Sequence, residues 1–266
     1  MSKLLVTLAA ILALVPAALW PLRRADALQR PVFGLLLGVA VAGPAAYVAN
    51  QFLGQWHSGL AATIWVSVTA SVALFAVLAM GSPAARGLAP LACGYLALFA
   101  ALGSLWTQAP AAARPAVPVD ALLALHIGLS VLAYALATLA AVAGAAVVIK
   151  QGALKRKRPG PLSRVLPAVA EAERLQVRLL GAAGAVLGID IVSGMITQYV
   201  ASGVLLPFAH KPLFALLAFG VIAVLLVLHW RTGARGRGVA RLVLLAYLLL
   251  TLGYPGVKFV TDVVLA

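Results

Sequence analysis

A histidine, a serine and a tyrosine follow one another at intervals of four residues in a long apolar stretch of the chain. They are His126, Ser130 and Tyr134, and the stretch runs from residue 121 to residue 149. Side chains four residues apart lie on one face of a helix. An ionisable group at membrane depth is costly and normally faces a bundle interior or a ligand. This polar stripe is therefore the first candidate for a binding site, although a histidine hydrogen-bonded within the packing would give the same pattern.

Asp190 is a second costly group, and it lies inside the apolar segment 178–198. Measured from the segment ends that we place on one side of a membrane, Asp190 is about 8 residues deep and His126 about 6, so their depths agree within roughly 3 Å. A carboxylate that accepts the second ring N–H of a ligand histidine fixes the tautomer and raises the basicity of the ring. We predict that Asp190 can meet His126; the alternative is an Asp190 that is protonated or bonded to another helix.

The chain has three further histidines, His57, His210 and His229. His210 and His229 stand at opposite ends of one apolar segment, roughly 28 Å apart along a helix, so they cannot share a metal ion. A metal held by two histidines would need both from one side, which leaves His126 with His210 or with His57. His229 needs a partner from another polypeptide, or it is an interfacial histidine beside Trp230.

The composition is that of a polytopic membrane protein. Hydrophobic residues make up 64% of the 266 residues and charged residues only 10%, against about 25% charged in soluble domains. A bilayer crossing needs about 20 apolar residues, and no connector is long enough to bury a core of its own. We therefore expect an all-α protein, with residues 1–266 forming one membrane-embedded bundle of eight transmembrane helices. The expected segments are 3–20, 31–50, 59–79, 88–106, 121–149, 178–198, 212–230 and 239–261.

The basic residues mark one side of the membrane. The net charge of +14 would suggest nucleic acid in a soluble protein, but sixteen of the twenty Lys and Arg residues fall in alternate connectors, after the first, third, fifth and seventh segments. Because Lys and Arg are retained in the cytoplasm, we expect a multi-pass protein of the inner (plasma) membrane with both termini facing outward. The first segment could instead be a signal peptide, but a clear cleavage site is missing.

Four local features complete the expected layout. Residues 161–178 mix apolar and charged positions, which predicts a helix that lies on the inner surface and leads into the segment 178–198. The basic cluster 155–158 before it is expected to set the topology and to touch anionic lipid. Cys93, the one cysteine, is expected to pack as a small hydrophobe. Pro16, Pro44 and Pro255 interrupt apolar segments, where we expect kinks.

Four ordered blocks in the second half of the chain carry a family resemblance. They read HIGLSVLAYALATLAAVAGAAVVIK, AERLQVRLLGAAGAVLGIDIVSG, HKPLFALLAFGVIAVLLVLHWRTGARGRG and LGYPGVKF. In this order they resemble the carboxy-terminal half of the cytochrome c assembly family, which includes the CcsA and HemX proteins and the YpjD-like inner-membrane proteins. The resemblance covers about residues 120–260 well, and the first four segments follow the family only by general pattern.

The resemblance implies that the chain handles haem. When the functional residues of the family are matched to this sequence, His126 corresponds to the outer haem-ligand histidine that opens the H-x-x-x-x-x-x-S-Y helix. Tyr134 matches the tyrosine of this motif, and Ala133 stands in place of the serine. His229 falls on the membrane histidine that precedes a basic G-x-R-G-x loop. The tryptophan-rich W-G-x-x-W-x-W-D-P-K stretch of CcsA proteins is absent, and only Lys211 survives from its end. The last helix supplies no second outer histidine, so the chain is similar to the shorter eight-helix HemX or YpjD type.

The expected haem site is an apolar slot among segments 121–149, 178–198, 212–230 and 239–261. His126 would be the axial ligand, with Lys211 or Lys258 beside the propionates. Ser130, Tyr134, Asp190 and His210 complete the candidate binding residues, and His229 is the second candidate metal ligand. We expect a partner in the membrane during cytochrome c maturation.

No arrangement of paired carboxylates, of a nucleophile with a base, or of a phosphate-binding loop is present, so we expect no enzyme catalysis. Two alternatives to haem handling remain open. The first is a haem-independent permease or channel for small molecules, which predicts a water-lined cavity. The second is a structural subunit that stabilises another membrane complex, which predicts tolerance of all four histidine substitutions.

Overall fold

All regular elements in the described part of the chain are helices. The computed structural model describes residues 3–23, 28, 31–52, 59–106, 120–204, 210–233 and 236–260, and at Lys3, Phe52, His210 and Lys211 it describes the backbone alone. The elements are α1 (Lys3–Arg23), α2 (Pro31–Phe52), α3 (Leu60–Gly81), α4 (Pro83–Arg86), α5 (Ala89–Ser104), α6 (Ala121–Lys155), α7 (Pro161–Val165), α8 (Val169–Ser202), α9 (His210–Thr232), α10 (Arg237–Thr251), the π-helical turn η2 (Leu252–Gly256) and α11 (Val257–Phe259).

The predicted all-α fold is confirmed, and the predicted number of membrane-crossing helices is corrected. Each of the eight expected apolar segments corresponds to a helix, but in the described residues only seven spans are long and apolar enough to cross a membrane. The remaining one, α5, has 16 residues, which at 1.5 Å per residue is about 24 Å. A polytopic membrane protein with seven candidate membrane helices and one shorter apolar helix is therefore what the structure supports.

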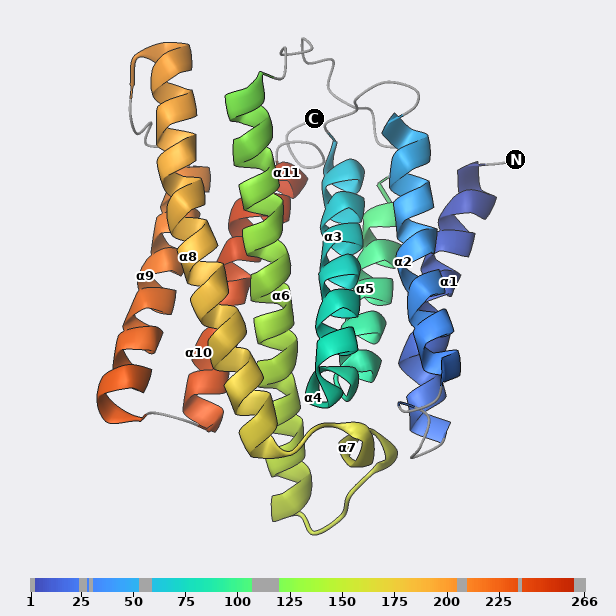
Figure 1. Cartoon of the computed structure of the whole chain (residues 1–266). Helices are drawn as coiled ribbons and strands as arrows, with labels where there is room; N and C mark the ends of the chain where they lie inside the picture. The colour runs from blue at the N-terminus through green and yellow to red at the C-terminus, as the bar shows by residue number, and fades with distance from the viewer. Residues whose placement is uncertain are drawn as a thin grey trace.

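Helix α6 lies at the centre of the bundle (Figure 1). It packs most extensively along α8, and it also contacts α10, α3 and α5. On one side of it, α8 packs on α9 and α9 on α10; on the other, α1, α2, α3 and α5 pack on one another. The two groups of helices meet mainly where α3 lies against α6, so α6 joins the first half of the chain to the second.

Small residues explain the central position of α6. All twelve residues from 133 to 144 are buried, and seven of these are Ala or Gly. Small residues allow neighbouring backbones to approach closely, which is what drives helix association in lipid. At Gly144, a Cβ would stand 3.4 Å from the Ala240 carbonyl oxygen of α10 and 3.5 Å from Gln176 Oε1 of α8. A larger side chain at this position would separate α6 from both helices.

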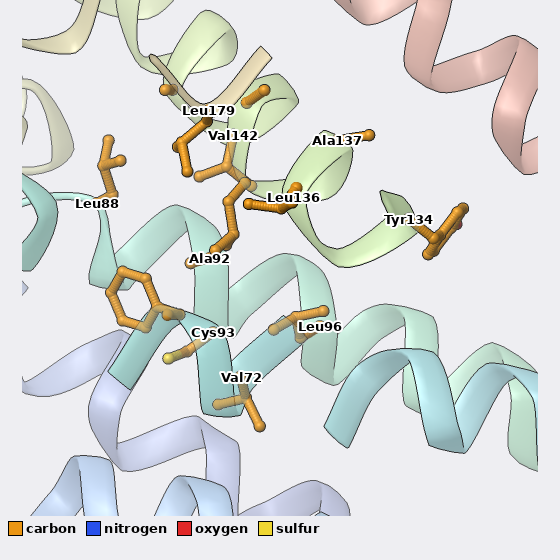
Figure 2. Packing of buried hydrophobic residues seen from close by; sticks show 14 of the residues in the cluster. Val72, Leu88, Ala92, Cys93, Leu96, Tyr134, Leu136, Ala137, Val142 and Leu179 are labelled. Carbon is orange, nitrogen blue, oxygen red and sulfur yellow. The ribbon is translucent and has the colours of Figure 1, made fainter. Parts of the chain in front are cut away.

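Cys93 lies in the buried core, as expected. Figure 2 shows its neighbourhood, where Val72 of α3, Leu96 of α5 and Leu136 of α6 contribute to one hydrophobic cluster. Cys93 has no exposed surface and forms no disulfide. The side chain therefore packs as a small hydrophobe.

The helix predicted over residues 161–178 is continuous with the following apolar helix, as expected, but it does not begin at residue 161. Only α7 (Pro161–Val165) is separate, while residues 169–178 form the first turns of the 34-residue α8. Glu171 accepts a hydrogen bond from the Ala168 backbone N–H at 3.2 Å and so satisfies a donor at the start of α8. A helix of 34 residues is about 51 Å long, longer than the hydrocarbon core. The mixed sequence thus belongs to the part of α8 that extends beyond the core.

One end of the bundle collects the basic connectors. The carboxyl ends of α1, α3, α6 and α9 all lie at the lower end in Figure 1, together with α7. Arg23, Arg86, Lys155 and Arg231 lie in the last turns of α1, α4, α6 and α9. We call this the basic end of the bundle.

Kinks were expected at three prolines. Pro255 lies within the π-helical turn η2, whereas α1 and α2 continue as helices on both sides of Pro16 and Pro44.

The close contact between α1 and α2 at Gly43 generates a test of the packing. A Cβ at Gly43 would stand 2.5 Å from the Ala13 Cβ, whereas nothing lies within 4 Å of one at Gly38. Gly43→Leu should therefore lower the free energy of unfolding by about 1–3 kcal/mol through overpacking. Gly38→Leu, on the same helix, should leave it nearly unchanged. Denaturation of the two variants in detergent micelles checks this, and equal effects would contradict the described α1–α2 contact.

Candidate functional site

Four polar side chains from α6 and α8 meet near the end of the bundle opposite the basic end. His126 Nδ1 lies 2.9 Å from Asp190 Oδ1 and 3.1 Å from Ser193 Oγ. Ser130 donates a hydrogen bond to Asp190 Oδ1 at 2.7 Å. The predicted meeting of Asp190 and His126 is therefore confirmed, and Ser130 belongs to the same group. We call these residues, His126, Ser130, Asp190 and Ser193, the polar cluster.

The contacts of His126 Nδ1 favour the tautomer that carries its proton on this nitrogen. Ser193 Oγ donates its one hydrogen to the Asp190 carbonyl oxygen at 2.8 Å, so it can only accept from the ring. A carboxylate oxygen of Asp190 also accepts. Both partners therefore require a hydrogen on Nδ1, and in the neutral ring the lone pair is on Nε2. No described residue forms a hydrogen bond with Nε2.

Gly194 makes room for the imidazole of His126 on the surface of α8. A Cβ at this position would stand 2.8 Å from His126 Cε1 and 3.4 Å from both ring nitrogens. A Cβ that close to the ring would force the imidazole to move. The absence of a side chain at Gly194 thus lets the ring lie against α8, within reach of Asp190 and Ser193.

The part of α6 that carries His126 is left open by the described residues. Every residue from 121 to 132 is exposed or half-buried, in contrast to the buried run that follows. The side chain of His126 is 29% exposed, and that of Asp190 is 10% exposed. Large apolar side chains next to these residues in the sequence are exposed, and Leu125 and Val192 are each 56% exposed. Among the described residues, His126 thus lies in a part of α6 where polar and apolar side chains are both partly exposed.

Tyr134 belongs to a different set of contacts from the polar cluster. It is buried, and its hydroxyl lies 3.1 Å from the Tyr247 hydroxyl and 3.2 Å from Thr251 Oγ1. Its ring packs against Tyr254, with 5.8 Å between the centroids. The Tyr247 hydroxyl in turn bonds that of Tyr95 of α5. The predicted stripe is thus divided: His126 and Ser130 bond to α8, while Tyr134 connects α6 to α10 and α5.

Among the predicted metal ligands whose side chains the structure describes, His229 does not lie near His126. His229 is half-buried in the last turn of α9, at the basic end, so it lies at the opposite end of the bundle from His126 (Figure 1). His210 opens α9, but its side chain and that of Lys211 lie outside the description, as does all of His57. Lys258 lies in α11. No three His, Cys, Asp or Glu residues come together as metal ligands within the described ranges.

Comparison with known proteins identifies the family. A model of the family described as cytochrome C assembly protein matches residues 34–265. The chain belongs to this family. The match begins in α2, so the first half of the chain, which resembles the cytochrome c assembly family only by general pattern, is included as well.

One curated relative covers nearly the whole chain. It is a protein of Azospirillum brasilense named as an uncharacterized 28.8 kDa protein in the nifR3-like 5' region. The two sequences are 45% identical over 273 residues, which covers 99% of each chain. No solved structure matches the chain.

Two groups of site residues in this member of the cytochrome c assembly family were not found from the sequence. Ser193 and Gly194 follow Asp190 at the third and fourth positions, a spacing that places them on its face of α8. Their residue types gave no signal, because Ser and Gly are common in membrane helices. The tyrosine network had a visible pattern that was overlooked, since three polar residues repeat along one helical face, namely Tyr247, Thr251 and Tyr254.

The contact between Gly194 and the ring generates the second prediction. Gly194→Ala should displace the imidazole and weaken its hydrogen bonds to Asp190 and Ser193, with a loss of stability below about 1 kcal/mol because the ring can rotate away. We expect altered imidazole nitrogen resonances of His126 in protein labelled with ¹⁵N-histidine. Gly181→Ala is the matched control, since no atom lies within 4 Å of that added Cβ on the same helix. Unchanged His126 signals in Gly194→Ala would count against the described packing.

Proposed function

We propose that the chain binds haem at the end of the bundle opposite the basic end, through Nε2 of His126, and handles it during cytochrome c assembly. The observation that carries the proposal is the orientation of the ring. Asp190 and Ser193 hold Nδ1–H, which leaves the Nε2 lone pair available to a metal. A carboxylate behind a ligand histidine is the usual device for fixing its tautomer and orientation.

The residues present fit haem better than they fit a bare metal ion. The described residues offer no cluster of three or more His, Cys, Asp or Glu, whereas haem brings four nitrogen ligands and needs only one or two axial ligands from the protein. The composition of this part of the bundle also suits a flat apolar ring, because α6 and α8 carry exposed Leu and Val side chains close in sequence to His126 and Asp190. Membership of the cytochrome c assembly family supports haem over other planar ligands.

The proposal assigns separate tasks to the two ends of the bundle. The basic end faces the cytoplasm by the retention of Lys and Arg there, so in the inner membrane both termini and His126 face outward. His229 lies at the basic end, and we assign it to a second haem contact at the inner side. Lys211 or Lys258, near the outer end, would neutralise the propionates.

The chain binds and positions its cargo, and we propose no catalysis by it. Bound haem would supply an iron centre whose behaviour depends on the axial ligand and on burial. Transfer to an apocytochrome needs release, and a partner in the membrane would receive the haem. A single histidine on an open face is compatible with exchange of this kind.

A direct test measures haem binding by absorbance. The purified protein supplied with haem should give a Soret band with the features of histidine ligation, and His126→Ala should lose most of it. Added imidazole should restore the band in His126→Gly if the ring acts as a ligand. A His126 with only a structural role would not respond to imidazole.

The outcome that contradicts the proposal is equally direct. A protein without any Soret band after haem supply, or a spectrum unchanged in His126→Ala, would remove His126 as ligand. His229→Ala should keep the band of the outer site, because the two histidines lie at opposite ends of the bundle.

Asp190 should tune this site without binding haem itself. Asp190→Asn keeps the size of the side chain but removes the charge behind the ring, and should weaken haem affinity about 10–100-fold. Asp120→Asn is the matched control: Asp120 caps the same end of α6 by accepting from the Leu123 N–H at 2.7 Å, and Asn caps equally well. Haem titration of both variants measures the affinities. An equal loss of affinity in the two would indicate that the overall negative charge near the site matters and the orientation of the His126 ring does not.

A further inference from the structure

A pocket that is open to the surface at the basic end of the bundle, which we call the cavity, is lined by three cationic side chains. Its volume is about 390 Å³, and Lys150, Lys157 and Arg164 contribute to its wall. No acidic side chain lines it among the described residues. Three positive charges around one hollow repel one another, and an anion placed there would relieve this repulsion.

The wall of this cavity is held in a defined shape. Lys150 Nζ donates hydrogen bonds to the carbonyl oxygens of Ser163 and Leu166, at 2.5 and 2.9 Å, and so fixes α7 beside the end of α6. The connection turns at Lys157, whose φ of 52° is the one positive value outside glycine in the described chain. The Ser163 hydroxyl bonds the Gly160 carbonyl oxygen at 2.9 Å. The cations are therefore carried by a bonded loop against a helix.

Lys150 keeps binding capacity after these contacts. An ammonium group has three N–H donors, and two of them are used by the carbonyl oxygens of the loop. The third is left for an occupant of the cavity. Arg164 adds a planar fork of donors that matches phosphate oxygens in pairs, and Lys157 adds a mobile point charge.

The position of the cavity selects the source of the anion. Lys150 directly follows Ile149, the last residue of the apolar stretch of α6, so the cavity begins where the hydrocarbon ends. Leu154, 63% exposed, and Pro159 form apolar parts of the same wall. Cationic side chains beside an apolar surface at the boundary between hydrocarbon and headgroups are complementary to a phospholipid, whose phosphate is joined through glycerol to acyl chains.

We propose that this cavity is a binding site for a phosphate group, supplied by an anionic phospholipid of the inner leaflet. Lys157 and Arg164 contact the phosphate. Lys150 supports the loop and donates its third N–H to the phosphate. Leu154 and Pro159 contact the apolar part of the lipid. The site is separate from the polar cluster around His126, because the two lie near opposite ends of α6.

The test compares two double variants that remove the same charge from the same loop. Lys157→Gln with Arg164→Gln removes two cavity cations and leaves Lys150 to hold α7. Lys155→Gln with Arg158→Gln removes two exposed cations outside the cavity wall. Delipidated full-length protein is titrated with phosphatidylglycerol, with phosphatidylcholine and with inorganic phosphate, and binding is followed by native mass spectrometry.

We expect selective binding of phosphatidylglycerol, weakened about tenfold to thirtyfold in the cavity variant and far less in the control. Binding of inorganic phosphate without preference for the anionic lipid, again lost in the cavity variant, would support the phosphate site and identify free phosphate as its source. Equal losses in both double variants, or equal binding of phosphatidylcholine, would overturn the proposal, because the attraction would then come from diffuse charge or from the apolar surface.

Discussion

The structure depends on the close packing of α6 against α8. In lipid there is no hydrophobic drive between helices, so contact must come from fitted backbones and from hydrogen bonds across the interface. The alanine-rich half of α6 supplies the fit, and the polar cluster supplies the hydrogen bonds in the other half. The same helix pair thus provides both the centre of the bundle and the surroundings of His126.

Two hydrogen-bond networks connect polar side chains of α6 with neighbouring helices. Asp190 is the only acidic residue among the described membrane segments that is buried, and it receives hydrogen bonds from two neighbours on α6. The hydroxyl groups of Tyr134, Tyr247 and Thr251 satisfy one another between α6 and α10. Since an unpaired polar group in hydrocarbon costs on the order of several kcal/mol, these networks fix which faces of the helices meet.

The sequence predicted the helices well because their signal is local. Length and apolar content identify a membrane segment without knowledge of its neighbours, and even the contact between His126 and Asp190 followed from their depths. The direction in which each side chain points around its helix axis was harder to predict from the sequence. Tyr134 shares the helical stripe of His126 but bonds to α10, since the rotation of α6 is decided by its packing on several helices at once.

The errors have physical causes of the same kind. One helix over 161–178 was expected from its mixed composition, but the chain breaks after α7, and residues 169–178 form charged outer turns of α8. Gly194 was overlooked because its contribution is the space that it leaves for a ring of another helix. Such an effect has no signature in the residue type and depends on which helix lies opposite.

The shortness of α5 has a consequence for the surrounding lipid. Its 16 residues span about 24 Å against a hydrocarbon thickness of about 30 Å, and Leu98 and Leu102 on its outer side are exposed. Lipid tails beside α5 must therefore compress, or another protein must replace them there. Hydrophobic mismatch of this kind costs fractions of a kcal/mol per Å, and in this bundle that cost falls on the lipid beside α5.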